Sequence, residues 1–361
     1  MDNKSGMINI NDFDPNGIGI SGNLFGLPFD ENTSEMIIIP VPWEVTVSYA
    51  SGTAEGPKAI LNASNQVDLF QEDIPNAWKL GVTLLPINEA IRSDNHKFRL
   101  MAANYIHWLE QGAESQEGER FAAVPGIINQ ACEKMNQWVY ETAKFYLAKN
   151  KSVGLLGGDH STPLGLLRVM AEKHPEFGVL QVDAHADLRP AYENFEYSHA
   201  SIAYNWLKIP QVKSLVQVGI RDFCEQEWRL AQEDPRISLF TAEEINTSLF
   251  NQHSWDLICI DILSSLPNKV YLSIDIDGLD PQLCPHTGTP VPGGLSYAQL
   301  VYLIKKVVRS GREIIGFDIV EVAPGPAADE WDANVGARLL YRVANLTALS
   351  QGRLHWGKGV K

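Results

Sequence analysis

The stretch Gly178–Asp187 reads GVLQVDAHAD and is the most informative segment of the chain for predicting its architecture. A short, mostly apolar run is followed at once by Asp183, His185 and Asp187 at alternate positions. Such a run predicts a buried strand, and side chains two apart in extended backbone point the same way. We therefore expect the two acids and the imidazole to face one point at the end of a strand.

Similar apolar runs recur along the chain, and helix-compatible segments separate most of them. The other runs are Met36–Pro40, Leu80–Leu85, Ser152–Leu156, Ser214–Val218, Ile237–Phe240, Val270–Ile276 and Glu313–Ile319. Strands that alternate with helices imply a parallel sheet with right-handed crossovers. Runs that are apolar on both faces are typical of sheets covered on both sides. The sequence predicts an α/β fold, a three-layer sandwich with a mostly parallel, doubly wound central sheet.

No internal repeat or linker divides the chain. We predict an irregular N-terminal lead-in over residues 1–35 and a single α/β domain over residues 36–361. Apolar residues at helical spacing predict helices over 98–112 and 125–149. The polar stretch GAESQEGERFAAVPG between them predicts a loop, and we interpret this 110–125 region as an insertion or a lid.

Charge and composition narrow the range of partners. The 361 residues carry a formal net charge of −15 at pH 7. This charge argues against nucleic acid, because phosphate binding needs a positive surface, and it is compatible with a small cationic substrate. The four cysteines lack CxxC spacing, which fits neither a disulfide framework nor a structural zinc site. We see no signal peptide and no apolar run long enough for a membrane span, so we expect a cytoplasmic protein.

Three more polar clusters follow predicted strands. They are LLGGDHS with Asp159 and His160, YLSIDIDGLDP with Asp275 and Asp277, and GFDIVEVAP with Asp318 and Glu321. Ligands of open α/β sheets collect beyond the carboxyl ends of the strands, so we expect the clusters to converge on one crevice.

Clustered carboxylates repel one another and are costly to bury unless they are paired or bind a cation. With His160 the set contains four carboxylates and two imidazoles, enough for two divalent cations that share ligands. These donors suit Mn²⁺, and nickel, iron, cobalt or zinc are alternatives. Aspartate also occurs in ordinary strand-end turns, but four aspartates and a histidine in two short segments favour the metal interpretation. A nicotinamide dehydrogenase is excluded, because no GxGxxG opens a βαβ unit.

GGDHS, DAHADLR…SHA, SIDIDGLDP and EVAP, in this order, resemble the motifs of the ureohydrolase family, which includes arginases and agmatinases. Within this family, the motifs most resemble those of agmatinases. The resemblance covers roughly residues 36–345 and includes SYASGTAEGPKAI early and WDANVGARLLYRV late. It implies an arginase-like catalytic domain, two Mn²⁺ ions per subunit, with Ni²⁺ or another divalent metal as the alternative, and a homo-oligomer, either a trimer or a hexamer.

The resemblance also assigns roles to residues. It implies that one cation binds His160, Asp183, Asp187 and Asp275, and that the other binds His185, Asp183, Asp275 and Asp277, with Asp183 and Asp275 bridging. The cations would lower the pKa of a water, so that hydroxide attacks a guanidinium carbon and urea and an amine are released. Asp187 would orient the hydroxide, His199 would shuttle protons, and Glu321 would pair with the guanidinium.

The substrate implied by the resemblance is a guanidino compound, foremost agmatine, which gives putrescine in polyamine metabolism. The loop LRPAYENFEY carries Glu193 and Glu196, which suit an amine tail, and Arg189, which suits a carboxylate tail or a surface ion pair. Arginine, guanidinobutyrate, guanidinopropionate, guanidine and formiminoglutamate are alternative substrates. A metal-loaded binding protein without turnover is the alternative outside enzymes.

Overall fold

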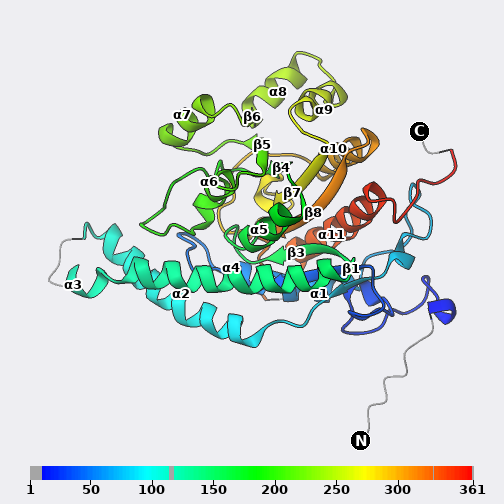
Figure 1. Ribbon diagram of the computed structural model, residues 1–361, viewed down its shortest axis with the longest axis horizontal. Coiled ribbons are helices and arrows are strands. Elements are labelled where there is room, and N and C mark those ends of the chain that lie inside the picture. The colour runs from blue at the N-terminus through cyan, green and yellow to red at the C-terminus, as the bar shows by residue number, and fades with distance from the viewer. Residues whose placement is uncertain (1–9, 114–117, 328, 360–361) are drawn as a thin grey trace, which may run out of the picture.

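The computed structural model describes residues 10–113, 118–327 and 329–359, and its centre is an eight-stranded sheet (Figure 1). The strand order is β2-β1-β3-β8-β7-β4-β5-β6, and every neighbouring pair is parallel. The strands are β1 (Met36–Val41), β2 (Val82–Leu84), β3 (Ser152–Gly157), β4 (Phe177–Val182), β5 (Val212–Ile220), β6 (Ile237–Thr241), β7 (Lys269–Asp275) and β8 (Glu313–Val320).

Helices connect the strands. The α-helices are α1 (Gly56–Ser64), α2 (Glu89–Glu110), α3 (Gly118–Phe121), α4 (Val124–Ala148), α5 (Leu164–Lys173), α6 (Ile202–Leu207), α7 (Glu225–Glu233), α8 (Ala242–Phe250), α9 (Trp255–Ser264), α10 (Tyr297–Arg309) and α11 (Trp331–Ser350). The 3-10 helices are η1 (Ile10–Asp12), η2 (Leu24–Gly26), η3 (Thr53–Glu55), η4 (Ala77–Leu80), η5 (His199–Ser201) and η6 (Ile276–Gly278).

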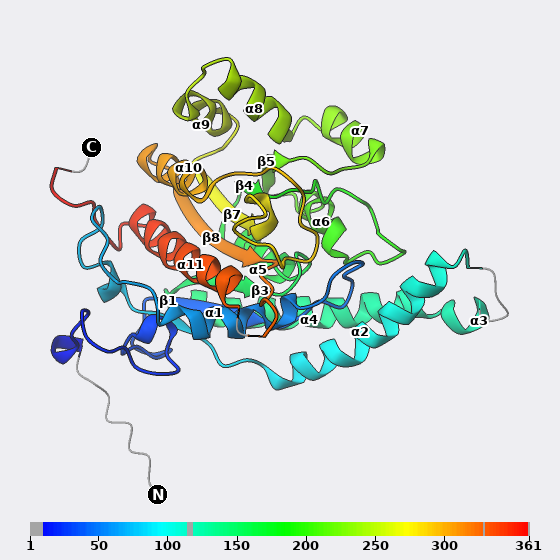
Figure 2. The same ribbon diagram turned by 180° about the vertical axis from the view of Figure 1, so that it is seen from behind.

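The helices cover both faces of the sheet, because successive strand side chains point to opposite sides. In β1, Met36 and Ile38 are buried in one core cluster with residues of α1 and α8–α11. Ile37 and Ile39 are buried in the other cluster with residues of α2 and α4–α7. Figures 1 and 2 view the two faces, with α4 and α5 in front in Figure 1 and α1 and α11 in front in Figure 2. The predicted three-layer α/β fold is confirmed.

The predicted strands coincide with observed strands, but one helix begins earlier than predicted. Helix α2 starts at Glu89 rather than at residue 98, and the side chain of Asn88 caps it by accepting hydrogen bonds from the backbone N–H groups of Ala90 and Ile91. The first turns of α2 are mostly polar, so hydrophobic spacing alone could not reveal them. Helix α4, at Val124–Ala148, lies within one residue of its prediction at each end.

Two predicted irregular regions extend beyond the described residues. Residues 114–117 of the predicted 110–125 loop lie outside them, and the loop also contains the short helix α3. Residues 1–9 of the lead-in lie outside them as well. The remainder of the lead-in contains only the short helices η1 and η2. Phe25 is buried, and its ring centroid lies 4.9 Å from that of Tyr341 in α11. The lead-in therefore packs on the domain, and the domain boundary stays a prediction.

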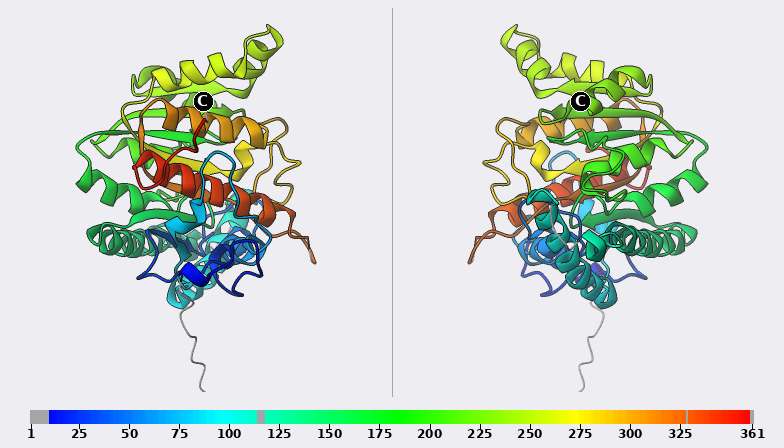
Figure 3. Two further views of the ribbon diagram at one scale, coloured as in Figure 1. Left: turned by 90° about the vertical axis from the view of Figure 1, so that its right-hand side faces the viewer. Right: turned by 90° about the vertical axis from the view of Figure 1, so that its left-hand side faces the viewer.

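Different helices lie at the two ends of the molecule. All views place α7, α8 and α9 at one end, near β6, and α2 at the opposite end, as the side views in Figure 3 also show. Within the described residues, no helix combines the length and the apolar character needed to cross a bilayer.

Candidate metal centre

Polar side chains gather where four neighbouring strands end. Strands β3, β8, β7 and β4 are adjacent in the sheet, so the segments after them lie close together although they are distant in the chain. This edge is the one at which open α/β sheets bind ligands. It carries Asp159 and His160 after β3, Asp183, His185 and Asp187 after β4, Asp275 and Asp277 at the end of β7, and Glu321 after β8.

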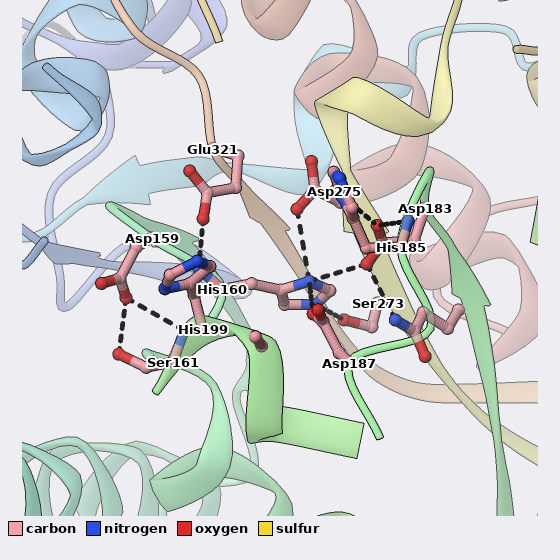
Figure 4. A network of polar contacts seen from close by, with 12 residues as sticks. Asp159, His160, Ser161, Asp183, His185, Asp187, His199, Ser273, Asp275 and Glu321 are labelled. Carbon is pink, nitrogen blue, oxygen red and sulfur yellow. Dashed lines mark hydrogen bonds and ion pairs between the residues drawn. The ribbon is translucent and has the colours of Figure 1, made fainter. Parts of the chain in front are cut away.

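His160 lies at the centre of a first candidate ligand group (Figure 4). Its Nδ1 is 2.9 Å from Asp183 Oδ2, 3.1 Å from Asp187 Oδ2 and 3.3 Å from Asp275 Oδ2. All four side chains are buried. His160, Asp183 and Asp275 offer ligand atoms that lie within 4.8 Å of one another. These atoms could surround one cation.

A second candidate group contains Asp183, His185 and Asp277, whose ligand atoms also lie within 4.8 Å of one another. His185 Nδ1 is 3.1 Å from Asp277 Oδ2 and 3.6 Å from Asp183 Oδ1. Asp183 thus belongs to both groups, with Oδ2 facing His160 and Oδ1 facing His185. Asp275 belongs to the first group only, so its bridging role stays a prediction.

Backbone N–H groups orient the carboxylates of these groups. Asp183 Oδ1 accepts a hydrogen bond from His185 N–H at 2.6 Å. Asp277 Oδ1 accepts one from Ala184 N–H at 3.0 Å, and Asp275 Oδ1 accepts one from Asp277 N–H at 2.8 Å. Hydrogen bonds to an ionised carboxylate are short and strong. They hold each carboxylate in one orientation without adding a positive side chain.

Two acidic residues at the site have left-handed backbone, with φ of 54° at Asp187 and 62° at Glu321. This region is uncommon for residues other than glycine, and it persists where the surroundings hold it. Asp187 O accepts a hydrogen bond from Tyr204 N–H at 3.2 Å, and Glu321 N–H donates to Gly158 O at 2.8 Å. Non-glycine residues in this region cluster at functional sites, so the two positions support the candidate site.

The site has strongly perturbed acid–base properties. Burial, followed by the charges of Asp277 and Asp183, raises the pKa of Asp275 well above its ordinary value. Burial and then the charge of Asp183 raise the pKa of Asp187 to about 7. Burial would also raise the pKa of Asp183, but hydrogen bonds from His160 and His185 lower it below its ordinary value. Because so many buried acids are in contact, a nearby positive charge would stabilise their ionised forms.

Hydrogen bonds behind His160 indicate which of its ring nitrogens is protonated. Ser273 Oγ donates to Asp318 Oδ1 at 2.8 Å and lies 2.9 Å from His160 Nε2. Because the hydroxyl proton points to Asp318, Ser273 accepts from His160 Nε2–H. Nδ1 is then the nitrogen that faces the three carboxylate oxygens, and in the neutral ring that a metal requires it would present its lone pair to a cation there. A divalent cation among these donors would relieve the repulsion, so the residues fit a metal.

The structure places His199 beside the candidate ligands and Glu321 behind them. His199 begins η5, its N–H donates to Thr46 Oγ1 at 3.3 Å, and desolvation lowers its pKa to about 3. Its side chain lines the same cavity as His185 and Asp187. Glu321 is buried and accepts a hydrogen bond from His160 N–H at 2.8 Å. Glu321 therefore braces the strand end that carries His160.

A cavity of about 190 Å³ adjoins the candidate metal groups. It brings together residues from the loops after β1, β4, β5 and β7. The lining consists of Ser48, His185, Asp187, Arg189, Tyr192, His199, Ala200, Asp222, Phe223, Glu227 and Thr289.

Asp222, Phe223 and Glu227 were not predicted from the sequence. They follow β5, which neighbours β4 in the sheet. The strand-end rule that selected Asp183 could have selected Asp222 in the stretch GIRD. Within the described residues, the Asp222 side chain has no hydrogen bond or ion pair, whereas Glu227 accepts from Leu188 N–H at 3.0 Å and Cys224 N–H at 2.9 Å.

The loop LRPAYENFEY, which was predicted to bind the tail of the substrate, does not contribute the predicted acids to the cavity. Neither Glu193 nor Glu196 lines the cavity, so the acids expected to meet an amine tail are replaced by Asp222. Arg189 Nε lies 3.6 Å from Glu227 Oε2, and its guanidinium lies 4.8 Å from the centre of the Tyr192 ring. Arg189 pairs with the buried Glu227 and also lines the cavity, so both alternatives derived from the sequence stay open.

Comparison with known sequences relates the chain to one family. A sequence model of the arginase family matches residues 34–345. An N(1)-aminopropylagmatine ureohydrolase of Thermus thermophilus is 35% identical, over 91% of this chain and 94% of that protein. An agmatinase of Pyrococcus horikoshii is 31% identical, over 88% of this chain and 94% of its own.

Solved structures share the fold. The agmatine ureohydrolase of Thermoplasma volcanium superposes with a TM-score of 0.68 at 20% identity, over 92% of this chain and 96% of that chain. An arginase from Bacillus subtilis superposes with a TM-score of 0.61 at 21% identity, over 86% of this chain and 98% of that chain. At these identities the likeness concerns the fold alone.

Proposed function

The chain belongs to the arginase family, and on that premise we propose that it hydrolyses the guanidino group of a small cationic compound, releasing urea and an amine. Agmatine, which would give putrescine, is the foremost substrate. The observation that carries the proposal is the pair of candidate ligand groups that share Asp183 beside an acidic cavity.

The proposed cofactor is a pair of divalent cations, with Mn²⁺ favoured by the oxygen-rich donors and Ni²⁺ as the alternative. One cation would be held by His160, Asp183, Asp187 and Asp275, and the other by His185, Asp183, Asp275 and Asp277. When bound, such cations lower the pKa of water, so that hydroxide is available near neutral pH. The perturbed pKa values of Asp187 and Asp275 support a site built to hold positive charge.

The remaining steps belong to the protein's own side chains. Asp187 would accept a hydrogen bond from the attacking water and orient it toward the guanidinium carbon. His199, which is neutral because its pKa is lowered, would carry protons from the water to the leaving nitrogen. Glu321 does not line the described cavity; it accepts from His160 N–H through Oε1 and would pair with the guanidinium through Oε2. The oxygen of the water ends in urea, and both of its protons end on the leaving amine.

Asp222 supports a substrate with a positively charged tail. It is the carboxylate of the cavity that no side chain neutralises within the described residues, because Glu227 is engaged by Arg189 and by backbone N–H groups. An ammonium group would pair with Asp222, and a carboxylate tail would be repelled. Arginine and guanidinobutyrate are therefore less favoured than agmatine.

A longer polyamine is the second candidate substrate. The relative from Thermus thermophilus carries the name N(1)-aminopropylagmatine ureohydrolase, and it is more similar to this chain than the agmatinase from Pyrococcus horikoshii. N(1)-aminopropylagmatine would present a second ammonium group to the open, acidic mouth of the cavity. Both candidates require the same hydrolysis and differ only in the tail.

Urea release from a panel of substrates tests the proposal. Protein loaded with Mn²⁺ should release urea from agmatine or N(1)-aminopropylagmatine, and slowly or not at all from arginine, guanidinobutyrate and guanidinopropionate. The variant Asp222→Asn should lower kcat/KM for the cationic substrates by about fivefold, one charge pair being worth about 1 kcal/mol, and Asp280→Asn, outside the cavity lining, serves as the control. A protein that binds metal but releases urea from no guanidino compound would contradict the enzymatic proposal.

The cellular setting is also proposed. All four cysteines are free, as is common in the reducing cytoplasm. Phe250, Leu257 and Ile260 of α8 and α9 are exposed apolar side chains, which supports a homo-oligomer in solution; the resemblance to ureohydrolases implies a trimer or a hexamer. A role in polyamine metabolism follows if agmatine or its aminopropyl derivative is the substrate.

A further inference from the structure

Two glutamine side chains lie behind the candidate metal centre, between the sheet and the helices that cover it. Gln181 in β4 and Gln217 in β5 are register partners in adjacent strands, and both are fully buried. Burying an amide is costly unless it is hydrogen-bonded. Apolar side chains would serve packing equally well at these positions, so the amides call for another explanation.

The two amides form a continuous chain of hydrogen bonds that ends on a candidate metal ligand. Gln217 Nε2 donates to Ala186 O at 2.6 Å and to Gln181 Oε1 at 2.8 Å. Gln181 Nε2 donates to Asp183 Oδ2 at 2.8 Å. The chain therefore joins β5, the backbone just before Asp187, and the carboxylate that both ligand groups share.

The direction of these bonds is set by their ends. The Asp183 carboxylate and the Ala186 carbonyl can only accept, so each must face an NH₂ group. This requirement orients both amides and leaves Gln217 Oε1 without a hydrogen-bond partner within the described residues. An unsatisfied buried acceptor is a cost, which indicates that the orientation of the amides is selected.

We propose that Gln181 and Gln217 position Asp183 so that its two oxygens serve two different cations, an inference that rests on the proposed two-metal function. Gln181 holds Oδ2 on the side of His160 Nδ1, 2.9 Å away, while His185 N–H holds Oδ1 on the other side at 2.6 Å. A lysine or arginine could also orient Asp183, but its charge would compete with the cations. A neutral amide orients the carboxylate and leaves its negative charge available.

Metal binding tests this positioning role. Gln181→Leu and Gln217→Leu remove the two links, and Gln71→Leu, a buried glutamine outside the network, is the matched control. The measurements are Mn²⁺ affinity by chelator competition and the electron paramagnetic resonance spectrum of the loaded protein. We expect Gln181→Leu to weaken binding by about 10- to 100-fold, the usual effect of losing a group that orients a ligand, and to replace the spectrum of a coupled Mn²⁺ pair by that of isolated ions.

Gln217→Leu keeps the side chain that touches Asp183 and should give a smaller effect of the same kind. The double variant should be no worse than Gln181→Leu, because both changes break one chain. If Gln181→Leu does not fold, the comparison of Gln217→Leu with the control carries the test. Unchanged affinity and spectrum in the folded variants would overturn the inference, as would fully additive losses. Absence of two bound ions or of urea release in the unmodified protein would instead overturn the proposed function.

Discussion

At the scale of single residues, the site is defined by donors that lack a counter-charge. Asp183 contacts two imidazoles, a glutamine amide and a backbone N–H group, and His160 Nδ1 faces three carboxylate oxygens. Each contact alone would be ordinary for a strand end. Together they leave more buried negative charge than two imidazoles neutralise, which is why cations are the simplest partners.

His199 provides the first prediction at this scale. His199→Ala should retain both metal ions and lose about 10²- to 10⁴-fold in kcat, the usual contribution of a positioned acid or base. The exposed His253 offers the control His253→Ala, which should keep full activity. Metal content and urea release measured on the same preparations separate the two effects, and unchanged turnover in His199→Ala would exclude the proton-transfer role.

His174 provides a prediction about stability, independent of the site. It is buried, and burial followed by the charge of Lys269 lowers its pKa to about 4. Between pH 6.5 and pH 4 the unfolded chain binds a proton that the folded chain does not, so stability is full above about pH 6.5 and falls as the pH drops.

Equilibrium unfolding in urea should report this loss. Between pH 7 and pH 5.5 the histidine should cost about 1 kcal/mol of the free energy of unfolding, and His174→Gln should remove that part of the pH dependence. His253→Gln, at an exposed position, should leave it intact. The same pH profile for His174→Gln and the unmodified protein would show that His174 is protonated in the folded state.

At the scale of elements, close backbone contacts fix the strand ends. A Cβ added to Gly158, just after β3, would lie 2.0 Å from Trp43 O, and one added to Gly56 at the start of α1 would lie 2.1 Å from Val322 O. The loops after β1, β3 and β8 therefore touch backbone to backbone. The contact between Gly158 and the Trp43 backbone fixes the position of His160, which lies two residues further along the chain.

Paired glycine substitutions test this packing. Gly158→Ala should force the loops apart, lowering the free energy of unfolding by about 1–3 kcal/mol and weakening Mn²⁺ binding. Gly126→Ala, in the exposed first turn of α4 with no atom near the added Cβ, should instead stabilise by about 0.5–1 kcal/mol and leave metal binding intact. Equilibrium denaturation and Mn²⁺ titration of both variants test this prediction. Equal effects of the two substitutions on stability and metal binding would contradict close backbone packing of the loops.

The strands and the polar residues that follow them could be predicted from the sequence, because both faces of the sheet are apolar and every candidate ligand follows a strand. The start of α2 could not be predicted, because its N-terminal cap lies in a polar segment. Asp222 follows a strand and fits the strand-end rule, but a single aspartate there is common in turns, and its place in the cavity depends on β5 lying next to β4. The glutamine pair depends on strand register, which hydrophobic spacing does not encode.

At the scale of the molecule, the fold brings segments from four strand ends to one edge of a sheet while two cores support it from either side. The net charge of −15 creates a field that attracts cations, both metals and polyamine-like substrates. Asp183 links these features, because it belongs to both candidate ligand groups.

Metal content by elemental analysis tests the central claim most directly. After loading with Mn²⁺ and removal of free metal, the unmodified protein should hold two ions per chain, Asp277→Ala should hold one, and Asp183→Ala should hold none, because Asp183 is shared by the two candidate ligand groups. Asp183→Ala that retains two ions, or an unmodified protein that retains fewer than two, would contradict this expectation.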